Sequence, residues 1–290
     1  MSSTALLLVV AAAIAHAAWN LLAKRAAHVG SAFVFAYGLC CTIVYAPWVV
    51  WILVFEHNDW SWPIVLAIVL SGALHLAYSL CLQRGYQVAD LSVVYPVARG
   101  TGPLLSTIGA LLLLGEPATA RGLSGMLCVV AGVLLIATQG RLRKLLQPEA
   151  MAGVRWGALV GAFIAAYTVL DAYGVKTLLI APVVFDWATC VSRTLIMLPH
   201  TARQPKHAIA AMRGYWPLAW AIGVLSPLGY ILVLYALRDG APVSLVAPAR
   251  EMSMLLVTLA GLYLLREPAG WGRLVGCGSI ALGVVLLAGG

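Results

Sequence analysis

Apolar runs of about 20 residues follow one another along almost the whole chain, and a helix of that length spans the hydrocarbon core of a bilayer. The runs lack the alternation of polar and apolar residues that a membrane β-strand requires, so each is predicted to be a helix. We predict ten such spans, approximately residues 4–22, 31–54, 62–83, 91–114, 122–139, 156–173, 178–198, 215–236, 243–265 and 270–289.

The composition excludes a soluble domain. Of 290 residues, 62% are hydrophobic and only 10% are charged, whereas a soluble domain carries about 25% charged residues. The net charge of +8 lies mainly in short loops between apolar runs, which is typical of the positive-inside rule and does not indicate nucleic-acid binding. We therefore expect a multi-pass protein of the inner cell membrane, which contacts the lipid bilayer and binds no nucleic acid.

The sequence contains no recognisable catalytic or cofactor motif. The glycine-rich text "GTGPLL" lacks the ending and context of a phosphate loop, and no Ser-His-Asp, HExxH or paired-carboxylate pattern stands out. The six cysteines all fall inside apolar runs without metal-ligand spacing. We expect no enzyme activity, no metal and no cofactor.

The second half of the chain repeats the first. "ARGTGPLLSTIGALLLLGEP" from Ala98 matches "AREMSMLLVTLAGLYLLREP" from Ala249, an offset of 151 residues that places Arg99 on Arg250. Each half holds five spans, and two copies of an odd number of spans must enter the membrane in opposite orientations. The prediction is an all-α membrane protein with ten transmembrane helices, built as two inverted five-helix repeats around a central cavity.

The boundaries of the repeats follow from the long polar connection in the middle of the chain. We predict a first repeat over residues 1–140, a second repeat over residues 153–290, and a basic inter-repeat loop over residues 141–152.

A charge within a bilayer costs about 2.5 kcal/mol or more, so Arg99 in "YPVARGTGPLL" requires an explanation. Pro96 and Pro103 are predicted to interrupt span four, and Pro248 to interrupt span nine, each close to an arginine. A broken helix is tolerated only beside protein or a water-filled cavity. We therefore expect both arginines to face one central cavity from opposite walls.

These features together resemble the drug/metabolite transporter superfamily in its EamA-type branch of ten-helix transporters. The resemblance rests on the two five-span repeats, the "GEP" and "REP" turns that close spans four and nine, and the Trp19-Asn20…Lys24 stretch that ends span one. It covers essentially the whole chain and implies export of small molecules such as amino acids, drugs or sugars. The "YPVARGTGPLL" spelling also resembles a subgroup associated with phosphonate utilisation.

From the residues and the resemblance we expect a secondary active transporter that exports a small polar or anionic metabolite by alternating access. One alternative is an intramembrane enzyme or a non-transporting scaffold, and another is an exporter of amino acids or amphiphilic drugs without proton coupling. The expected partners are the small-molecule substrate and a proton as candidate coupling ion, and the sequence leaves a monomer and a homodimer equally open.

The candidate substrate-binding residues are those with polar or aromatic groups near the middle of spans: Trp19, Asn20, His75, Tyr78, Tyr95, Arg99, Tyr230 and Arg250. Glu251 is the candidate coupling residue. A structural reading stands beside each: the arginines can be held in ion pairs by Glu251 or Asp186, and His75 and the aromatic residues can be ordinary helix packing. Glu116 and Glu267 are predicted to be helix-capping turn residues.

The distribution of basic residues predicts the orientation of the chain. Short loops rich in Lys and Arg stay in the cytoplasm. Loops after even-numbered spans hold three basic residues, Arg121, Lys176 and Arg238. Loops after odd-numbered spans hold twelve: Lys24, Arg25, Arg84, Arg141, Arg143, Lys144, Arg155, Arg203, Lys206, Arg213, Arg266 and Arg273. Both termini are therefore predicted to face the outside, although most EamA-type exporters keep both termini in the cytoplasm.

Overall fold

The computed structural model describes residues 2–56, 60–264 and 270–289, and these residues form a helical bundle without β-strands. The first half contains α1 (Ser3–Lys24), η1 (Ala27–Val29), α2 (Ser31–Phe55), α3 (Trp62–Val88), α4 (Leu91–Leu113) and α5 (Ala120–Thr138). The connection contains the short 3₁₀ helices η2 (Leu142–Leu146) and η3 (Pro148–Ala150). The second half contains α6 (Met151–Lys176), α7 (Pro182–Ala202), α8 (Pro205–Ala211), α9 (Trp216–Arg238), α10 (Val243–Ala249), α11 (Met252–Leu264) and α12 (Trp271–Ala288).

Seven of the helices are long and apolar enough to cross a bilayer, namely α1, α2, α3, α5, α6 with the preceding η3, α9 and α12. Large apolar side chains such as Leu7, Phe55, Leu112 and Val285 point outward and are mostly exposed, as lipid-facing residues must be. The chain is therefore an integral, multi-pass membrane protein. Of the other predicted spans, α4 and α7 contain buried charges, and α10 and α11 are short, so the count of ten spans remains a prediction.

The prediction that prolines interrupt spans four and nine is right for span nine and wrong for span four. Helix α4 runs without a break through Pro96 and Pro103, packed along α6. Span nine divides into α10 and α11 at Arg250 and Glu251, two residues after Pro248. There the backbone tightens, because Glu251 N–H donates to the Pro248 carbonyl three residues back, at 3.0 Å.

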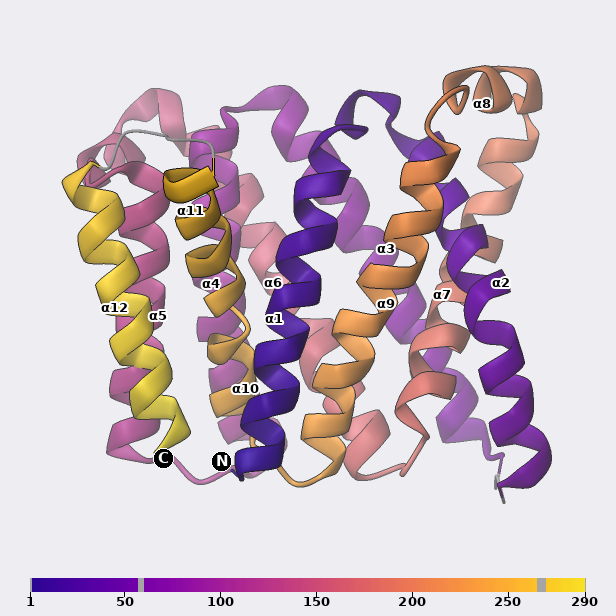
Figure 1. Cartoon of the computed structure of the whole chain (residues 1–290), viewed down its shortest axis with the longest axis horizontal. Helices are drawn as coiled ribbons and strands as arrows, with labels where there is room; N and C mark the ends of the chain where they lie inside the picture. Colours follow the sequence, from indigo (N-terminus) through magenta and orange to yellow (C-terminus); the bar gives the residue numbers. More distant parts are fainter. Residues whose placement is uncertain (1, 57–59, 265–269, 290) are drawn as a thin grey trace.

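The two halves interlock. The first helix of each half packs against the third and fourth segments of the other half: α6 lies against α3 and α4, and α1 lies against α9 and α11. Both chain ends lie at the same end of the bundle, and α8 lies at the opposite end (Figure 1). The interior that receives the polar residues is therefore built jointly by both halves.

Helices α5 and α12 approach each other closely through glycines. A Cβ at Gly132 would lie 2.7 Å from the Gly276 carbonyl oxygen, and a Cβ at Gly276 would lie 2.8 Å from the Gly132 carbonyl oxygen. Gly125 and Gly283 make the same reciprocal contact, at 2.9 and 2.7 Å. Only glycine permits this separation of backbones, as is usual for small residues at membrane helix interfaces.

Glu116, in the turn after α4, holds the start of α10. Its Oε1 accepts from Val243 N–H at 2.7 Å, and its Oε2 accepts from the backbone N–H and the hydroxyl of Ser244 at 2.9 and 2.7 Å. Lys176 Nζ at the end of α6 lies 3.2 Å from Oε1. Glu116 is thus the cap that the sequence predicts, and it satisfies donors at the start of the short helix that leads to Arg250. The corresponding Glu267 lies outside the described residues.

These contacts also set the ionisation of Glu116. Burial alone raises the pKa of the carboxyl, but the hydrogen bonds from Ser244 and Val243 and the Lys176 ammonium outweigh burial and hold the pKa below its usual value. A carboxyl with a lowered folded-state pKa adds stability above its unfolded pKa and loses that contribution as the pH falls through the folded pKa.

We expect Glu116→Gln to lower the free energy of unfolding by about 1–3 kcal/mol at neutral pH, because the amide cannot accept from both Val243 and Ser244 as a carboxylate does. Thermal unfolding of the purified protein in detergent measures the loss. The difference from the wild type should shrink below about pH 4, as the wild-type carboxylate is protonated. The exposed Glu149→Gln serves as the control, and equal melting of Glu116→Gln and the wild type at neutral pH would contradict the capping role.

Candidate functional site

Arg99 on α4 lies within the bundle and reaches residues of both halves. Its Nε lies 3.1 Å from Glu251 Oε2 at the break between α10 and α11, and the Arg99 side chain is 15% exposed. Its Nη2 lies 3.2 Å from Ser253 Oγ and 3.2 Å from His16 Nε2 on α1. Its guanidinium carbon lies 5.7 Å from the centre of the Tyr95 ring, one helical turn earlier. Four segments of the chain therefore meet at this arginine.

The partner of Arg99 is Glu251, one of the two carboxylates that the sequence offered for an ion pair. The contact has the distance of an ion pair without the angle of a hydrogen bond, because neither Arg99 Nε nor Glu251 Oε2 has a hydrogen-bond partner among the described residues. In this arrangement Glu251 balances the charge of Arg99, and its role as a coupling residue stays a prediction.

Arg250 lies beside Glu251 in the chain but points to a different cluster. Its guanidinium carbon lies 5.1 Å from the centre of the Tyr230 ring on α9, and no carboxylate in the described ranges forms an ion pair with it. A cation over an aromatic face is stabilised by the ring quadrupole, but its charge is not cancelled. Of the two arginines, Arg250 is therefore the one whose charge is not neutralised by a carboxylate among the described residues.

A small cavity lies beside Arg250, between α1 and α9. It holds about 20 Å³, and its walls are Ala12, Ala13, His16, Gly229, Tyr230, Val233 and Arg250. That volume suits about one water molecule and excludes a metabolite. Arg250 therefore lines this space, whereas Arg99 reaches it only through its contact with His16, and the space is too small for a substrate in this structure. That both arginines face one central cavity stays a prediction.

Asp171 on α6 forms a second polar cluster. Its Oδ1 accepts from Ser71 Oγ on α3 at 2.6 Å, and its Oδ2 accepts from the Tyr230 hydroxyl at 2.5 Å. His75 Nε2 lies 3.9 Å from Oδ2. Because Tyr230 also lies under the guanidinium of Arg250, this tyrosine connects Asp171 with the cavity.

Aromatic rings surround this cluster. Tyr167 stacks on His75 with ring centres 3.9 Å apart, and it also lies edge-on to Tyr78 and Tyr230 with ring centres 5.8 and 6.2 Å away. His75, Tyr78 and Tyr230, three candidates from distant parts of the sequence, are thus brought together around Tyr167 and are partly shielded from lipid.

Trp19 and Asn20 on α1 both donate to His16, but to different atoms of it. Trp19 Nε1 donates to His16 Nδ1 at 3.2 Å, which places its indole beside the Arg99 cluster. Asn20 Nδ2 donates to the His16 carbonyl oxygen at 2.7 Å within α1. The structure therefore uses the amide of Asn20 on the backbone of its own helix, and no hydrogen bond in the described residues joins it to Arg99 or Arg250.

His16 lies between two donors. Its Nδ1 faces Trp19 Nε1 and its Nε2 faces Arg99 Nη2, and neither partner can accept a hydrogen bond. A neutral imidazole has only one acceptor nitrogen, so one of the two short contacts is not satisfied as a hydrogen bond. An acceptor group between His16 and Arg99 would relieve this conflict.

Besides Tyr167, four residues of these clusters were not among the candidates from the sequence: His16, Ser71, Asp171 and Ser253. Asp171 had the strongest available signal, because an ionisable residue inside a membrane span is a functional candidate by default. The repeat offset of 151 residues also sets it against Asn20. The other three are small or common residues whose role depends on the neighbour they reach.

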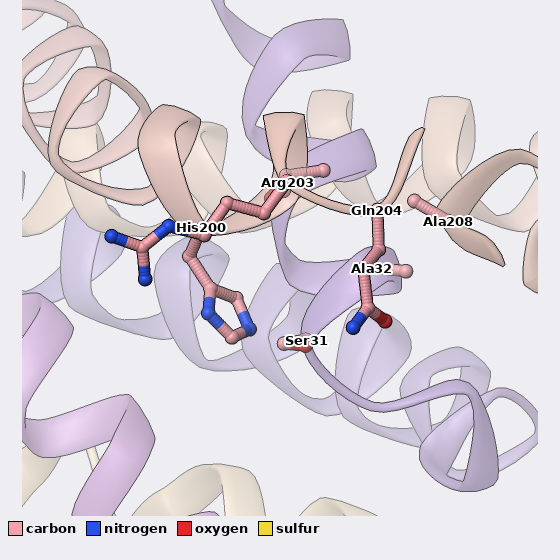
Figure 2. Close-up of a pocket in the computed structure, with 7 residues that line it drawn as sticks. Ser31, Ala32, His200, Arg203, Gln204 and Ala208 are labelled. Atoms are coloured by element: carbon pink, nitrogen blue, oxygen red, sulfur yellow. The ribbon is translucent and has the colours of Figure 1, made fainter. Parts of the chain in front are cut away.

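A larger hollow of about 260 Å³ lies away from these clusters, at the end of the bundle that carries α8. Its walls come from the start of α2, the end of α7 and the segment around α8: Ser31, Ala32, His200, Thr201, Arg203, Gln204 and Ala208. The side chains of Arg203 and Gln204 point away from each other (Figure 2). These divergent groups do not converge on a common ligand position, so the hollow is the weaker candidate site.

The sequence matches the model of the EamA-like transporter family over residues 3–138 and 151–289. The chain belongs to this family. It is therefore a membrane transporter, in agreement with the resemblance found in the sequence and with the apolar helices of the structure. The arginine clusters lie where segments of both matched ranges of this EamA-like transporter meet.

Two further comparisons give shorter or more distant similarities. Multidrug resistance protein EbrB of Bacillus atrophaeus and that of Bacillus subtilis (strain 168) are each 36% identical to this chain over 78 residues. The match covers 26% of this chain and 62% of each relative, so the chain spans less than two thirds of these relatives' length. One solved structure, titled only "Crystal structure of protein", aligns with 99% of this EamA-like chain, and the alignment covers 98% of the solved chain. The TM-score is 0.73 and the sequence identity is 17%, which shows that the two chains share a fold.

We expect Arg99→Gln and Glu251→Gln each to destabilise this transporter by about 3–5 kcal/mol, because each leaves one buried charge without its partner. The double variant Arg99→Gln/Glu251→Gln should lose clearly less than the sum of the two single losses, since no buried charge is left alone. Thermal unfolding in detergent of the wild type and the three variants measures this coupling. Strictly additive losses would show that the 3.1 Å contact contributes nothing.

Proposed function

We propose that this protein is a secondary active transporter that moves a small anionic or zwitterionic metabolite by alternating access, with export as the expected direction. One observation carries the proposal: Arg250 lies inside the bundle beside an enclosed cavity, without an ion pair among the described residues. An arginine fork matches the oxygens of a carboxylate or phosphonate bidentately. A substrate anion is the group that this arginine lacks.

The proposed architecture is two inverted five-helix repeats, over residues 1–140 and 153–290, joined by the basic loop 141–152. Three features support it. The family model matches two separate ranges of the chain. The first helix of each half packs in the equivalent way against the other half. Gly125 and Gly132 are each 151 residues before Gly276 and Gly283, and the four meet in reciprocal contacts. Rocking of one repeat against the other would open the closed cavity to each side in turn.

The ten spans of this proposal are α1 to α7, α9, α10 with α11 as one broken span, and α12. A broken span near a binding site is a recurrent feature of transporters, because its free backbone groups line the cavity. The break at Arg250 and Glu251 lies directly beside the enclosed cavity. The proposal therefore places the substrate at this break, with Arg99, His16 and Tyr230 around it.

A second candidate substrate class is an amphiphilic drug, a positively charged one included. The multidrug resistance relatives suggest it, and the rings of Tyr78, Tyr167 and Tyr230 could receive a cation. Two buried arginines oppose this assignment, because each repels a second cation in the low-dielectric interior. An intramembrane enzyme or a passive scaffold is the less favoured class, because the chain belongs to a transporter family.

We expect Arg250→Lys to reduce the flux of the transported anion about 10- to 100-fold, because the charge-assisted bidentate contact with the anion is lost. The change should have little effect on folding. Proteoliposomes with labelled methylphosphonate, L-glutamate and L-alanine measure this flux. Arg84→Lys, at an exposed arginine whose Nη1 donates to Gln87 Oε1 at 3.4 Å, is the matched control and should keep wild-type flux.

Full flux of every anion in the Arg250→Gln variant would overturn the anion-binding role of this residue. If the wild type carries none of the three compounds but does carry the cation ethidium, the amphiphilic-drug alternative replaces the anion proposal.

The orientation is also a proposal. Both termini lie at one end of the bundle, and α8 lies at the other end (Figure 1). The basic residues counted after odd-numbered spans, Arg25, Arg84 and Arg203 among them, are proposed to lie on the side opposite the termini. Because short basic loops stay in the cytoplasm, we propose that the termini face the outside of the inner membrane.

A reporter fused to the C-terminus tests this orientation. We expect activity from a reporter that works only in the periplasm and none from a reporter that works only in the cytoplasm. Changing Arg141 and Arg143 to Gln removes two basic residues from one side of the membrane and should weaken the preference for this orientation. Strong cytoplasmic signal from the wild-type fusion would show that the charge rule fails for this chain.

A further inference from the structure

Asp171 is the buried group that the binding of an anion leaves unexplained. It is 1% exposed, and its carboxylate receives hydrogen bonds only from the hydroxyls of Ser71 and Tyr230. No Lys or Arg in the described ranges forms an ion pair with it. A carboxylate buried without a cation is costly, and inside a membrane such a group marks a functional site.

The hydrogen bonds of His75 fix which of its nitrogens carries hydrogen. Its Nδ1 lies 3.0 Å from the Ser71 carbonyl oxygen and 3.3 Å from Ser71 Oγ. The carbonyl can only accept, and the Ser71 hydroxyl hydrogen is already donated to Asp171. Nδ1 is therefore assigned the hydrogen, and Nε2 of the neutral ring has a free lone pair.

That lone pair faces the carboxylate. His75 Nε2 and Asp171 Oδ2 lie 3.9 Å apart, and both are hydrogen-bond acceptors when the ring is neutral and the carboxylate is ionised. One added proton turns this repulsive contact between two acceptors into an attractive one, and a hydrogen bond forms once the 3.9 Å separation shortens to about 3 Å. The proton does so whether it resides on the carboxyl or on the imidazole.

We propose that His75 and Asp171 form a binding site for one proton, and that filling this site strengthens the attraction of Arg250 for an anion. The inference rests on the proposed function in taking Arg250 as the anion-binding group. The proton comes from water and returns to water, so no bond other than the one to the proton is made or broken. The coupling residue is then Asp171, while Glu251 balances Arg99.

Tyr230 provides the link between the proton site and the anion site. Its hydroxyl donates to Asp171 Oδ2, and the guanidinium of Arg250 lies over its ring. An ionised Asp171 supplies negative charge near Arg250 and competes with a substrate anion, and a protonated Asp171 does not. Because such coupling is reciprocal, anion binding must also strengthen proton binding.

The other ionisable groups around Asp171 carry charges of both signs. On α7, the carboxylate of Asp186 lies close enough to repel that of Asp171, and the guanidinium of Arg193 repels a positive charge on His75. On α4, the charge of Arg99 is balanced by Glu251. The remaining neighbours are the phenols of Tyr167 on α6 and Tyr230 on α9, together with Arg250 at the break that follows α10.

Infrared difference spectroscopy of the purified full-length protein tests the proton site without any substrate. Between about pH 4 and 9, which brackets ordinary Asp and His values, the wild type should show one buried carboxyl band that titrates. Asp171→Asn should remove the band, and His75→Gln should move its midpoint. The proposal is overturned if the wild type shows no such band, or if the band survives Asp171→Asn and disappears in Glu251→Gln.

Arg250→Gln tests the link in the same measurement. Loss of the nearby positive charge should move the midpoint of the band to higher pH by about 0.5–1 unit, less than the 1–3 units of a direct contact. Arg84→Gln removes a distant, exposed charge and should leave the midpoint unchanged. An unchanged midpoint in Arg250→Gln would show that proton and anion sites are independent.

The measurement separates this inference from the proposed function. A titrating Asp171 band that responds to Arg250→Gln supports the proton site even if methylphosphonate, L-glutamate and L-alanine all fail to cross the membrane. Anion flux that is lost in Arg250→Lys but occurs without any titrating Asp171 band supports the transporter and refutes the proton site.

Discussion

The structure depends on the cost of leaving a charged or polar group unpaired inside a bilayer. Lipid offers no hydrogen bonds, so each such group must find its partner within the protein. In this chain the partners come from opposite halves, and the polar contacts therefore join the halves while the apolar surface faces lipid. The contacts that do so are Arg99 with Glu251, Glu116 with Lys176, Val243 and Ser244, and Ser71 with Asp171.

This separation of a lipid-facing apolar surface from polar contacts in the interior explains which part of the fold could be predicted from the sequence. The helices follow from apolar runs, which report burial in lipid segment by segment, and each predicted run is helical in the described residues. The local path of the chain is harder to predict. Pro103 lies in an unbroken α4 whereas Pro248 precedes a break, because a helix tolerates a missing donor where its neighbours pack closely. Helix α8 was not predicted, since a helix of 7 residues in a polar connection leaves little periodicity to read.

The candidate site shows a similar limit. Arg99, Arg250 and Tyr230 could be selected individually, because charges and aromatic rings within apolar runs are conspicuous. Their grouping could not be predicted, since it depends on which side chains face each other across helices that are far apart in sequence. His16 illustrates the difficulty: its importance comes from Trp19 on one side and Arg99 on the other, and only the second lies far away in the chain.

The break in span nine accounts for the division of the polar interior into two clusters. Adjacent residues in a helix point about 100° apart, so Arg250 and Glu251 address different neighbours from one position in the chain. Glu251 reaches Arg99 on α4, while Arg250 reaches the Tyr230 ring on α9. A rotation of the chain at this break would change both contacts at once. Under the proposed alternating-access mechanism, opening of the Arg99 pair and release of Arg250 would then be a single conformational step, so that binding at one residue would alter the packing of both halves.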